Sequence, residues 1–326
     1  MPSMMFIINH DQRVLIFTVL VAFLFLPLSS FADRPTAASC QLQQPVNATF
    51  KWVSPRKIQL GDLAGNGQAD ERPIYEVNLD GFWMMDTEVT VAMYRRFMQQ
   101  SSKTIVPGCG FFSDGWQYSS DLSWAAPGFL QTPQHPVTCV NWLDANAFAD
   151  WFSKRSGLDV FLPTEAQWEA AARAGTTSPY FHGDNAQRLC QFGNGADQQA
   201  LQQYPSFSVL ACDDGYTHTA PVGRFKANAL GLYDMTGNVW EWVADCYSEN
   251  YQSASHTGAA HQQKQCPRQV FRGGGYGDVA HFLRISLRNR AAAAVRKDDI
   301  GFRLAGEQLP CCDPLQSTSI CPRLDE

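Results

Sequence analysis

Residues 228–245 read Asn-Ala-Leu-Gly-Leu-Tyr-Asp-Met-Thr-Gly-Asn-Val-Trp-Glu-Trp-Val-Ala-Asp. The stretch combines large apolar side chains with two carboxylates, Asp234 and Glu241, on either side of a Gly-Asn turn. Burial of the apolar side chains carries both carboxylates toward the interior, where a charge is costly unless it is paired or bound to a cation. Main-chain carbonyls at Gly237 and Val239 complete an all-oxygen set suited to Ca²⁺. The alternative is a buried turn whose carboxylates pair with arginines.

The composition predicts a packed globular protein. Of the 326 residues, 45% are hydrophobic and 17% are charged, which excludes an extended disordered chain. The formal net charge of −6 argues against a nucleic-acid partner.

The first 32 residues are typical of a secretory signal peptide. An apolar run over 14–28 follows Arg13, and Ser30-Phe31-Ala32 supplies a small-x-small cleavage site. The run, at about 15 residues, is shorter than the roughly 20 that a spanning helix needs. We therefore expect a periplasmic or secreted protein that does not span the membrane after cleavage. An uncleaved anchor is the alternative.

Ten cysteines follow the cleavage site, and an even count in an exported chain implies disulfides. The Cys-x-x-Cys spacing of metal sites is absent. The count does not determine the connectivity, but loops rich in Gly, Asp and Ser favour three local pairs. The expected pairs are Cys190–Cys212, Cys246–Cys266, Cys109–Cys139, and one of Cys311, Cys312 or Cys321 with Cys40.

Three helix starts are predicted from capping residues. Thr90 precedes apolar residues at helical spacing, and Asn141 precedes another such series. Thr164 and Gln167 form a capping box that begins a third helix. Glu165 and Glu169 in this helix have a sufficient structural explanation. Arginines at 288, 290 and 303 need buried partners, for which Asp278, Asp298 and Asp299 are the candidates.

The segment Gly-Leu-Tyr-Asp-Met-Thr-Gly-Asn-Val-Trp-Glu-Trp at 231–242 resembles the signature of the formylglycine-generating enzyme, or sulfatase-modifying factor, family. Segments at 135–142, 162–169, 271–276 and 300–304 resemble further motifs of the family in the same order. The resemblance covers residues 48–305. It implies a single α+β domain with little regular secondary structure, a variant of the C-type lectin-like fold. An N-terminal arm over 33–47 and a cysteine-containing tail over 306–326 flank this domain.

The resemblance also implies two structural calcium sites. One takes the side chains of Asp234 and Glu241 with the carbonyls of Gly237 and Val239. The other takes the side chains of Asn194 and Asp214 with the carbonyls of Gly195 and Tyr216, although the adjacent Asp213 leaves its register open by one residue.

The chain departs from the family at the copper site. The family enzymes oxidise a substrate cysteine with O₂ at a Cu(I) ion held by two thiolates, which are soft ligands. The second and seventh positions after the Gly-Gly-Ser-aromatic unit carry these cysteines. Here they are Asp278 and Leu283, and Gly275 takes the serine position. We therefore expect no copper and no formylglycine-forming activity.

Exported relatives that lack these cysteines suggest two functions. The first is a non-catalytic binding or regulatory protein with a protein or peptide partner. Such a protein would resemble TagR, which acts upstream of a type VI secretion membrane kinase that has a periplasmic domain. The second is an enzyme of different chemistry, similar to PvdO-like proteins of siderophore chromophore maturation. A structural or carbohydrate-binding role is the third possibility. The candidate pocket, in which His281 would be the acid–base group, consists of Gly275, Tyr276, Asp278, His281 and Arg288.

Overall fold

The computed structural model describes residues 38–113, 115–203 and 209–321, so the expected signal peptide over 1–32 lies outside the described residues. Among the residues that are described, no helix is both long and apolar enough to cross a bilayer.

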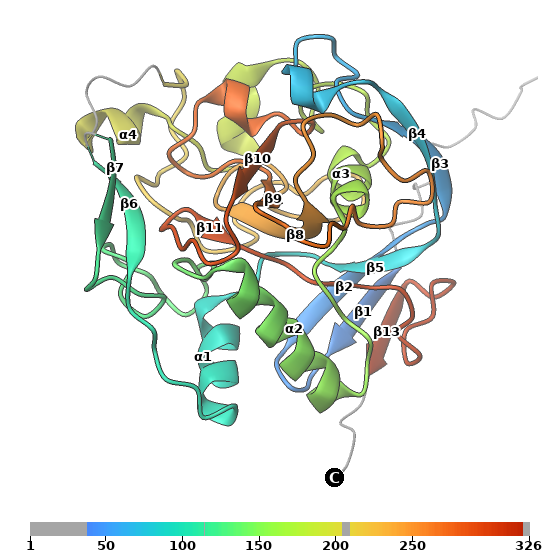
Figure 1. The fold of residues 1–326 in the computed structure, drawn as a ribbon, viewed down its shortest axis with the longest axis horizontal. Helices are drawn as coiled ribbons and strands as arrows, with labels where there is room; N and C mark the ends of the chain where they lie inside the picture. The colour runs from blue at the N-terminus through green and yellow to red at the C-terminus, as the bar shows by residue number, and fades with distance from the viewer. Residues whose placement is uncertain (1–37, 114, 204–208, 322–326) are drawn as a thin grey trace, which may run out of the picture. The chain divides into compact units, whose positions relative to one another are not determined.

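A five-stranded sheet joins the two ends of the described chain (Figure 1). Its strand order is β12 (Ala305–Gly306), β5 (Phe82–Met85), β2 (Ala48–Val53), β1 (Ser39–Leu42) and β13 (Thr318–Cys321). Neighbouring strands are antiparallel except β1 and β13, which are parallel. Residues expected in the N-terminal arm and in the cysteine-containing tail thus form adjacent strands of this sheet.

A second sheet contains the end of the opening stretch. Its order is β10 (Arg288–Ala291), β9 (Gln269–Arg272), β8 (Trp240–Cys246) and β11 (Ile300–Gly301). The β8 and β11 strands are parallel, with Ile300 opposite Trp240 and Gly301 opposite Glu241. Two hairpins complete the strands: β3 (Arg56–Leu60) with β4 (Tyr75–Leu79), and β6 (Cys109–Ser113) with β7 (Gly115–Ser119).

The predicted caps begin the three main helices. Thr90 accepts from the Met93 amide at the start of α1 (Val91–Gln100), and Asn141 caps α2 (Trp142–Ser156). The capping box of Thr164 and Gln167 is present at α3 (Glu165–Arg173). A short α4 (Gln198–Gln203) and the 3₁₀ helices Ala69–Glu71, Ala186–Gln191 and Ala280–Leu283 are the remaining helical elements described.

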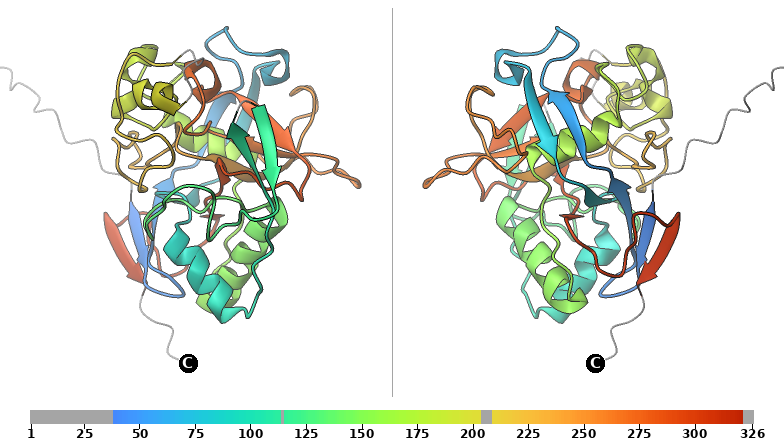
Figure 2. Two further views of the ribbon diagram at one scale, coloured as in Figure 1. Left: turned by 90° about the vertical axis from the view of Figure 1, so that its left-hand side faces the viewer. Right: turned by 90° about the vertical axis from the view of Figure 1, so that its right-hand side faces the viewer.

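The core is built from aromatic side chains between α1, α2 and the first sheet. The two helices lie side by side in both views of Figure 2. Phe97 of α1 meets Phe148 of α2 edge to face at 5.5 Å, and Phe50 of β2 meets Phe152 at 6.3 Å. Large rings bury much apolar area each and gain from edge-to-face contact, which explains how a chain with few regular elements holds together.

Helix α3 is buried on every side, so its charged residues need partners inside the protein. Glu165 accepts from Arg288 at 2.6 Å and from Arg272 at 2.9 Å. Glu169 accepts from Arg272 at 2.6 Å and from Arg173 at 2.7 Å. The structural interpretation of both glutamates is confirmed.

The predicted aspartate partners of the arginines are wrong. Arg288 pairs with Glu165, Arg290 approaches Asp70 at 3.6 Å, and Arg303 pairs with Glu241. The reason is tertiary: α3, β8 and the 3₁₀ helix Ala69–Glu71 bring Glu165, Glu241 and Asp70 to these guanidinium groups from distant sequence positions.

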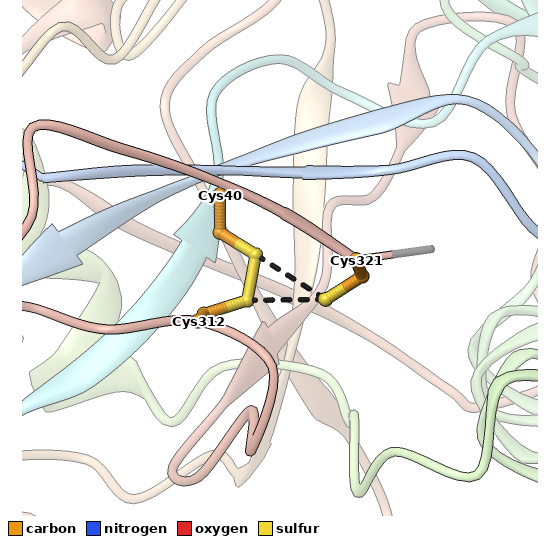
Figure 3. Close-up of side chains that lie close together, drawn as sticks. All are labelled: Cys40, Cys312 and Cys321. Atoms are coloured by element: carbon orange, nitrogen blue, oxygen red, sulfur yellow. Dashed lines mark hydrogen bonds between the residues drawn. A yellow bond between two sulfur atoms is a disulfide. The ribbon is translucent and has the colours of Figure 1, made fainter. Parts of the chain in front are cut away.

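All ten cysteines form disulfides, and the three predicted local pairs are confirmed. The remaining pairs are Cys40–Cys312 and Cys311–Cys321, which fasten the first and last described strands. These two disulfides touch, because the Cys321 sulfur lies 3.7 Å from that of Cys40 and 3.6 Å from that of Cys312 (Figure 3).

Candidate functional site

The turn after Asp234 folds tightly against residue 194. Asp234, Gly237 and Asn238 all have positive φ, at 56°, 80° and 64°. A Cβ on Gly237 would lie 2.0 Å from the Asn194 carbonyl oxygen, so only glycine fits there. The Asn238 amide donates to that same carbonyl at 2.8 Å. The structure therefore places residues of the two expected calcium sets next to each other.

The first set is only partly available to a cation. Glu241 is fully buried, and Arg303 donates to both of its carboxylate oxygens at 2.7 Å. Trp168 Nε1 donates to Oε2 at 2.9 Å. Pairing with an arginine, the alternative considered from the sequence, thus describes Glu241. The Gly237 and Val239 main chains lie in the same buried turn.

Asp234 differs, because one of its oxygens has no partner. Its Oδ2 accepts from the Gly223 amide at 2.7 Å, and buried Oδ1 has no N–H or hydroxyl donor among the described residues, although a hydrogen bond with the Glu88 carboxyl lowers the pKa of Asp234. Burial raises the pKa of Asp234. A buried, unpartnered carboxylate oxygen is what a hard cation such as Ca²⁺ would satisfy. The site fits calcium through Asp234, and not through Glu241 while Arg303 holds it.

Glu88 is a site residue that the sequence analysis missed. It is fully buried, and its Oε1 accepts from Asn238 Nδ2 at 2.9 Å while Oε2 has no partner among the described residues. Burial, followed by the neighbouring charge of Asp234, raises its pKa well above the usual value. The signal in the sequence was a carboxylate inside the apolar run at 82–91, where burial is expected.

The second set surrounds Asp214. Its two oxygens accept from the amides of Gly195, at 3.1 Å, and Tyr216, at 2.9 Å. Asn194 is fully buried, and its Oδ1 has no partner among the described residues. The carboxylate of Asp197 lies close to that of Asp214, and burial and then this charge raise the pKa of Asp214 to about 7. Asn194, Asp214 and Asp197 therefore offer oxygen atoms of the kind that Ca²⁺ prefers, and the sequence analysis did not include Asp197.

The positions of the family's copper ligands hold a hydrogen-bonded carboxyl and a packing residue. Asp278 Oδ2 accepts from the Gly275 amide at 2.8 Å. Leu283 is 1% exposed and packs against Gly195 and Gly274. A Cβ atom added to either glycine would lie 2.5 Å or less from the Leu283 side chain. No cysteine lines the cavity beside them.

That cavity, of about 300 Å³, is the candidate functional site. Its aromatic lining includes Trp116, Trp240, Phe271, Tyr276 and Phe282, and its charged lining is Asp278, Lys297, Asp298 and Asp299. Tyr276 and Asp278 of the expected pocket are therefore present. Gly275 contributes indirectly, because its amide donates a hydrogen bond to Asp278 Oδ2.

Two residues of the expected pocket lie elsewhere. His281 is exposed on the 3₁₀ helix 280–283, with its ring against Phe282. Arg288 is buried beside Glu165 and above the Tyr251 ring. The sequence interval was short enough to suggest one pocket, but the chain turns between these residues. Asp298 and Asp299 replace them because β11 follows directly and lies parallel to β8.

The carboxyls of the cavity are poorly solvated. Burial raises the pKa of Asp278 to about 6 and that of Asp298 to about 7. Burial, and then the charge of Asp298, raises the pKa of Asp299 well above its usual value. Tyr276 Oη donates to Asp298 Oδ2 at 3.0 Å. The arrangement can accept a positive charge or exchange a proton near neutral pH.

Comparisons with known proteins agree with this architecture. The sequence profile of the "Sulfatase-modifying factor enzyme 1-like domain" matches residues 44–308. The formylglycine-generating enzyme of Streptomyces coelicolor is 30% identical over 308 residues, covering 85% of this chain and 92% of that protein. A serine/threonine-protein kinase pkn1 of Chlamydia caviae is 30% identical over 268 residues, covering 80% of this chain and 38% of the kinase. The solved structure of PvdO from Pseudomonas aeruginosa is 29% identical, with a TM-score of 0.69, covering 80% of this chain and 95% of PvdO.

Proposed function

This chain belongs to the sulfatase-modifying factor family, and we propose that it serves there as a non-catalytic binding or regulatory protein rather than as a formylglycine-generating oxidase. One observation carries the proposal: carboxyl and leucine side chains stand at the two positions of the family's copper thiolates, and all ten cysteines are in disulfides. A hard carboxylate and an alkyl group are poor ligands for Cu(I).

The oxidase activity has a direct test. The purified protein is incubated with Cu(I), O₂ and a cysteine-containing sulfatase peptide, with the Streptomyces coelicolor enzyme as the positive control. We expect no conversion of the peptide cysteine to the formylglycine aldehyde by mass spectrometry. Conversion of the peptide cysteine by this chain would contradict the proposal.

The partner we propose is the periplasmic domain of a membrane kinase, in the manner of TagR in type VI secretion. Five disulfides support an exported protein, since such bonds persist in oxidising compartments. The similarity to pkn1 kinases supports an association of this domain type with kinases. The test is whether the immobilised protein captures the periplasmic domain of the kinase. The cytoplasmic domain of the same kinase, which should not be captured, is the negative control.

Export and calcium are part of the same proposal. The mature protein should begin at Asp33 when its N-terminus is sequenced after secretion. Metal analysis of protein purified without chelator should find calcium and no copper. Unpartnered oxygens of Asp234 and Asn194 support the calcium assignment.

A second candidate function is enzymatic, and the similarity to PvdO favours it. In this alternative the buried carboxyls of the cavity exchange protons during siderophore chromophore maturation. Restoration of chromophore formation in a Pseudomonas aeruginosa strain lacking PvdO would support it. Failure of the Asp298→Asn variant to restore it, with wild type active, would locate the chemistry in this cavity.

A further inference from the structure

We propose that the cavity between Trp240 and Asp298 binds the basic side chain, a primary ammonium or a guanidinium, of an extended peptide segment. The inference deepens the binding role proposed above and rests on it. It comes from four features of the cavity: a carboxyl oxygen without a partner, aromatic walls, an excess of acidic over basic groups, and a second cavity that adjoins it.

The unpartnered carboxylate is that of Asp298. Its residue is 5% exposed, Tyr276 occupies Oδ2, and Oδ1 has no partner among the described residues. Asp299 Oδ1 is buried and unpartnered in the same way. A buried acceptor without a donor costs free energy. Because this cavity contains two such acceptors, a ligand with N–H donors is expected to bind there favourably.

The aromatic walls suit an organic cation. Trp240 and Phe271 meet edge to face at 5.2 Å, and Tyr276 stands beside them in the lining. At the rim, Trp116 is 49% exposed and Phe282 is 40% exposed. Ring faces attract ammonium and guanidinium groups, most strongly where water is excluded. Lys297 makes a contact of this kind at the exposed rim, since its Nζ lies 3.6 Å from the Trp116 ring centroid.

The lining contains more acidic than basic side chains, so a further cation can be accommodated. Three carboxyls face a single ammonium, that of Lys297, which is engaged with Trp116. A metal ion fits less well, because it requires ligand atoms that converge. The described clusters of three ligand atoms within 4.8 Å of one another lie elsewhere and do not include these carboxyls. An organic cation with several N–H donors can contact separated carboxyls.

An adjoining cavity provides space for the rest of a peptide. It also measures about 300 Å³, shares Phe112 and Asp298 with the first, and includes Phe129 and His218 in its lining. Phe129 stacks on His218 at 4.5 Å and presents an apolar surface. The unpartnered carboxylate is therefore approached from two cavities, which suits a basic side chain whose flanking residues are apolar.

The experiment compares peptides that differ at one position. Acetyl-Gly-Phe-Xaa-Phe-Gly-amide is prepared with lysine, arginine, norleucine or glutamate as Xaa, and binding is measured by calorimetry and by tryptophan fluorescence. We expect the lysine or arginine peptide to bind at least tenfold more tightly than the norleucine peptide, and the glutamate peptide to be weakest. Equal affinity for lysine and norleucine, or no binding of any of the four, would overturn the inference.

Variants connect the affinity to the cavity. Asp298→Asn and Asp299→Asn should each weaken the basic peptide at least fivefold, while Asp80→Asn, at an exposed turn between β4 and β5, should leave it unchanged. Circular dichroism checks that each variant is folded. Unchanged affinity in both cavity variants would refute the assignment.

Two further measurements separate the possible outcomes. Butylamine that competes as well as the lysine peptide would assign the cavity to a free amine and overturn the peptide assignment. If a kinase domain is captured equally by wild type and by Asp298→Asn, the inference fails although the binding role stands. If no domain is captured but the lysine peptide binds, the cavity assignment stands while the kinase partner is wrong.

Discussion

Arg303 donates two hydrogen bonds of 2.7 Å to the Glu241 carboxylate, and neither side chain is exposed. The pair joins β8 to the segment that follows β11. Arg303 also donates to the carbonyls of Met85 and Tyr233, so one guanidinium ties three segments together. Breaking such a pair leaves an uncompensated charge in the interior.

The first prediction concerns this pair. Glu241→Gln should lower the free energy of unfolding by about 3–5 kcal/mol, because Arg303 then remains buried without its counter-charge. Urea denaturation measures the change. The matched control is Glu76→Gln in the exposed Lys57–Glu76 pair, which should cost about 0–1 kcal/mol. Similar costs for the two variants would contradict the structural role of the pair.

The second prediction concerns calcium. Added Ca²⁺ should raise the Tm of chelator-treated protein, and the rise should grow with the logarithm of its concentration above Kd. Asp214→Asn and Asp234→Asn should each reduce the rise, whereas Asp80→Asn should not. Glu88→Gln removes a buried carboxyl beside Asp234 and should diminish the response to calcium. An identical Tm with Ca²⁺ and with chelator would count against both sites.

The third prediction concerns pH. In the unfolded chain Asp298 ionises near its usual pKa of 3.8, whereas burial raises its pKa in the folded protein to about 7. The folded state therefore holds more protons than the unfolded state between these values, and the contribution of Asp298 to stability falls as the pH rises from about 4 to 7. Above pH 7 this contribution no longer changes.

The comparison of wild type with Asp298→Asn isolates that effect from Lys297, Asp299, Tyr276 and His218, which face the same space. The wild type should lose up to about 1.4 kcal/mol more per pH unit than the variant within this window. Unfolding free energies at pH 4.5, 5.5, 6.5 and 7.5 provide the test. Parallel pH profiles would show that Asp298 ionises normally.

The fourth prediction concerns the touching disulfides. In Cys312→Ser, the Cys40 thiolate is left 3.7 Å from the sulfur of Cys321 and should attack it, which forms Cys40–Cys321 and releases the Cys311 thiolate. Alkylation at pH 8 followed by peptide mapping should find the label on Cys311. The control is Cys266→Ser, in which the label should stay on Cys246. Label retained on Cys40 would show that the sulfurs do not exchange.

Sequence reasoning succeeded where the determinants are local. Thr90, Asn141 and the Thr164–Gln167 box cap helices through atoms three residues away, so the sequence contains both partners. Three disulfides close short loops and were predictable for the same reason. The family resemblance supplied the fold class, since its motifs occur in order along the chain.

Sequence reasoning failed where partners come from distant segments. Glu165 and Arg288 are 123 residues apart, and Glu88 and Asn238 are 150 apart. Proximity in the chain favoured Asp278 as a partner of the arginines and His281 as a pocket residue. The strand arrangement decided otherwise, because β11 beside β8 brings Asp298 and Asp299 to the cavity.

The parallel pairing of β1 with β13 has a practical consequence for protein production. A fragment cut at the matched limits, 44–308, would lack both strands and would leave β2 as an open strand with unpaired amides and carbonyls. Such a fragment is expected to self-associate through this exposed strand edge. Precipitation of the shortened protein would then indicate an unprotected sheet edge rather than a poorly packed hydrophobic core.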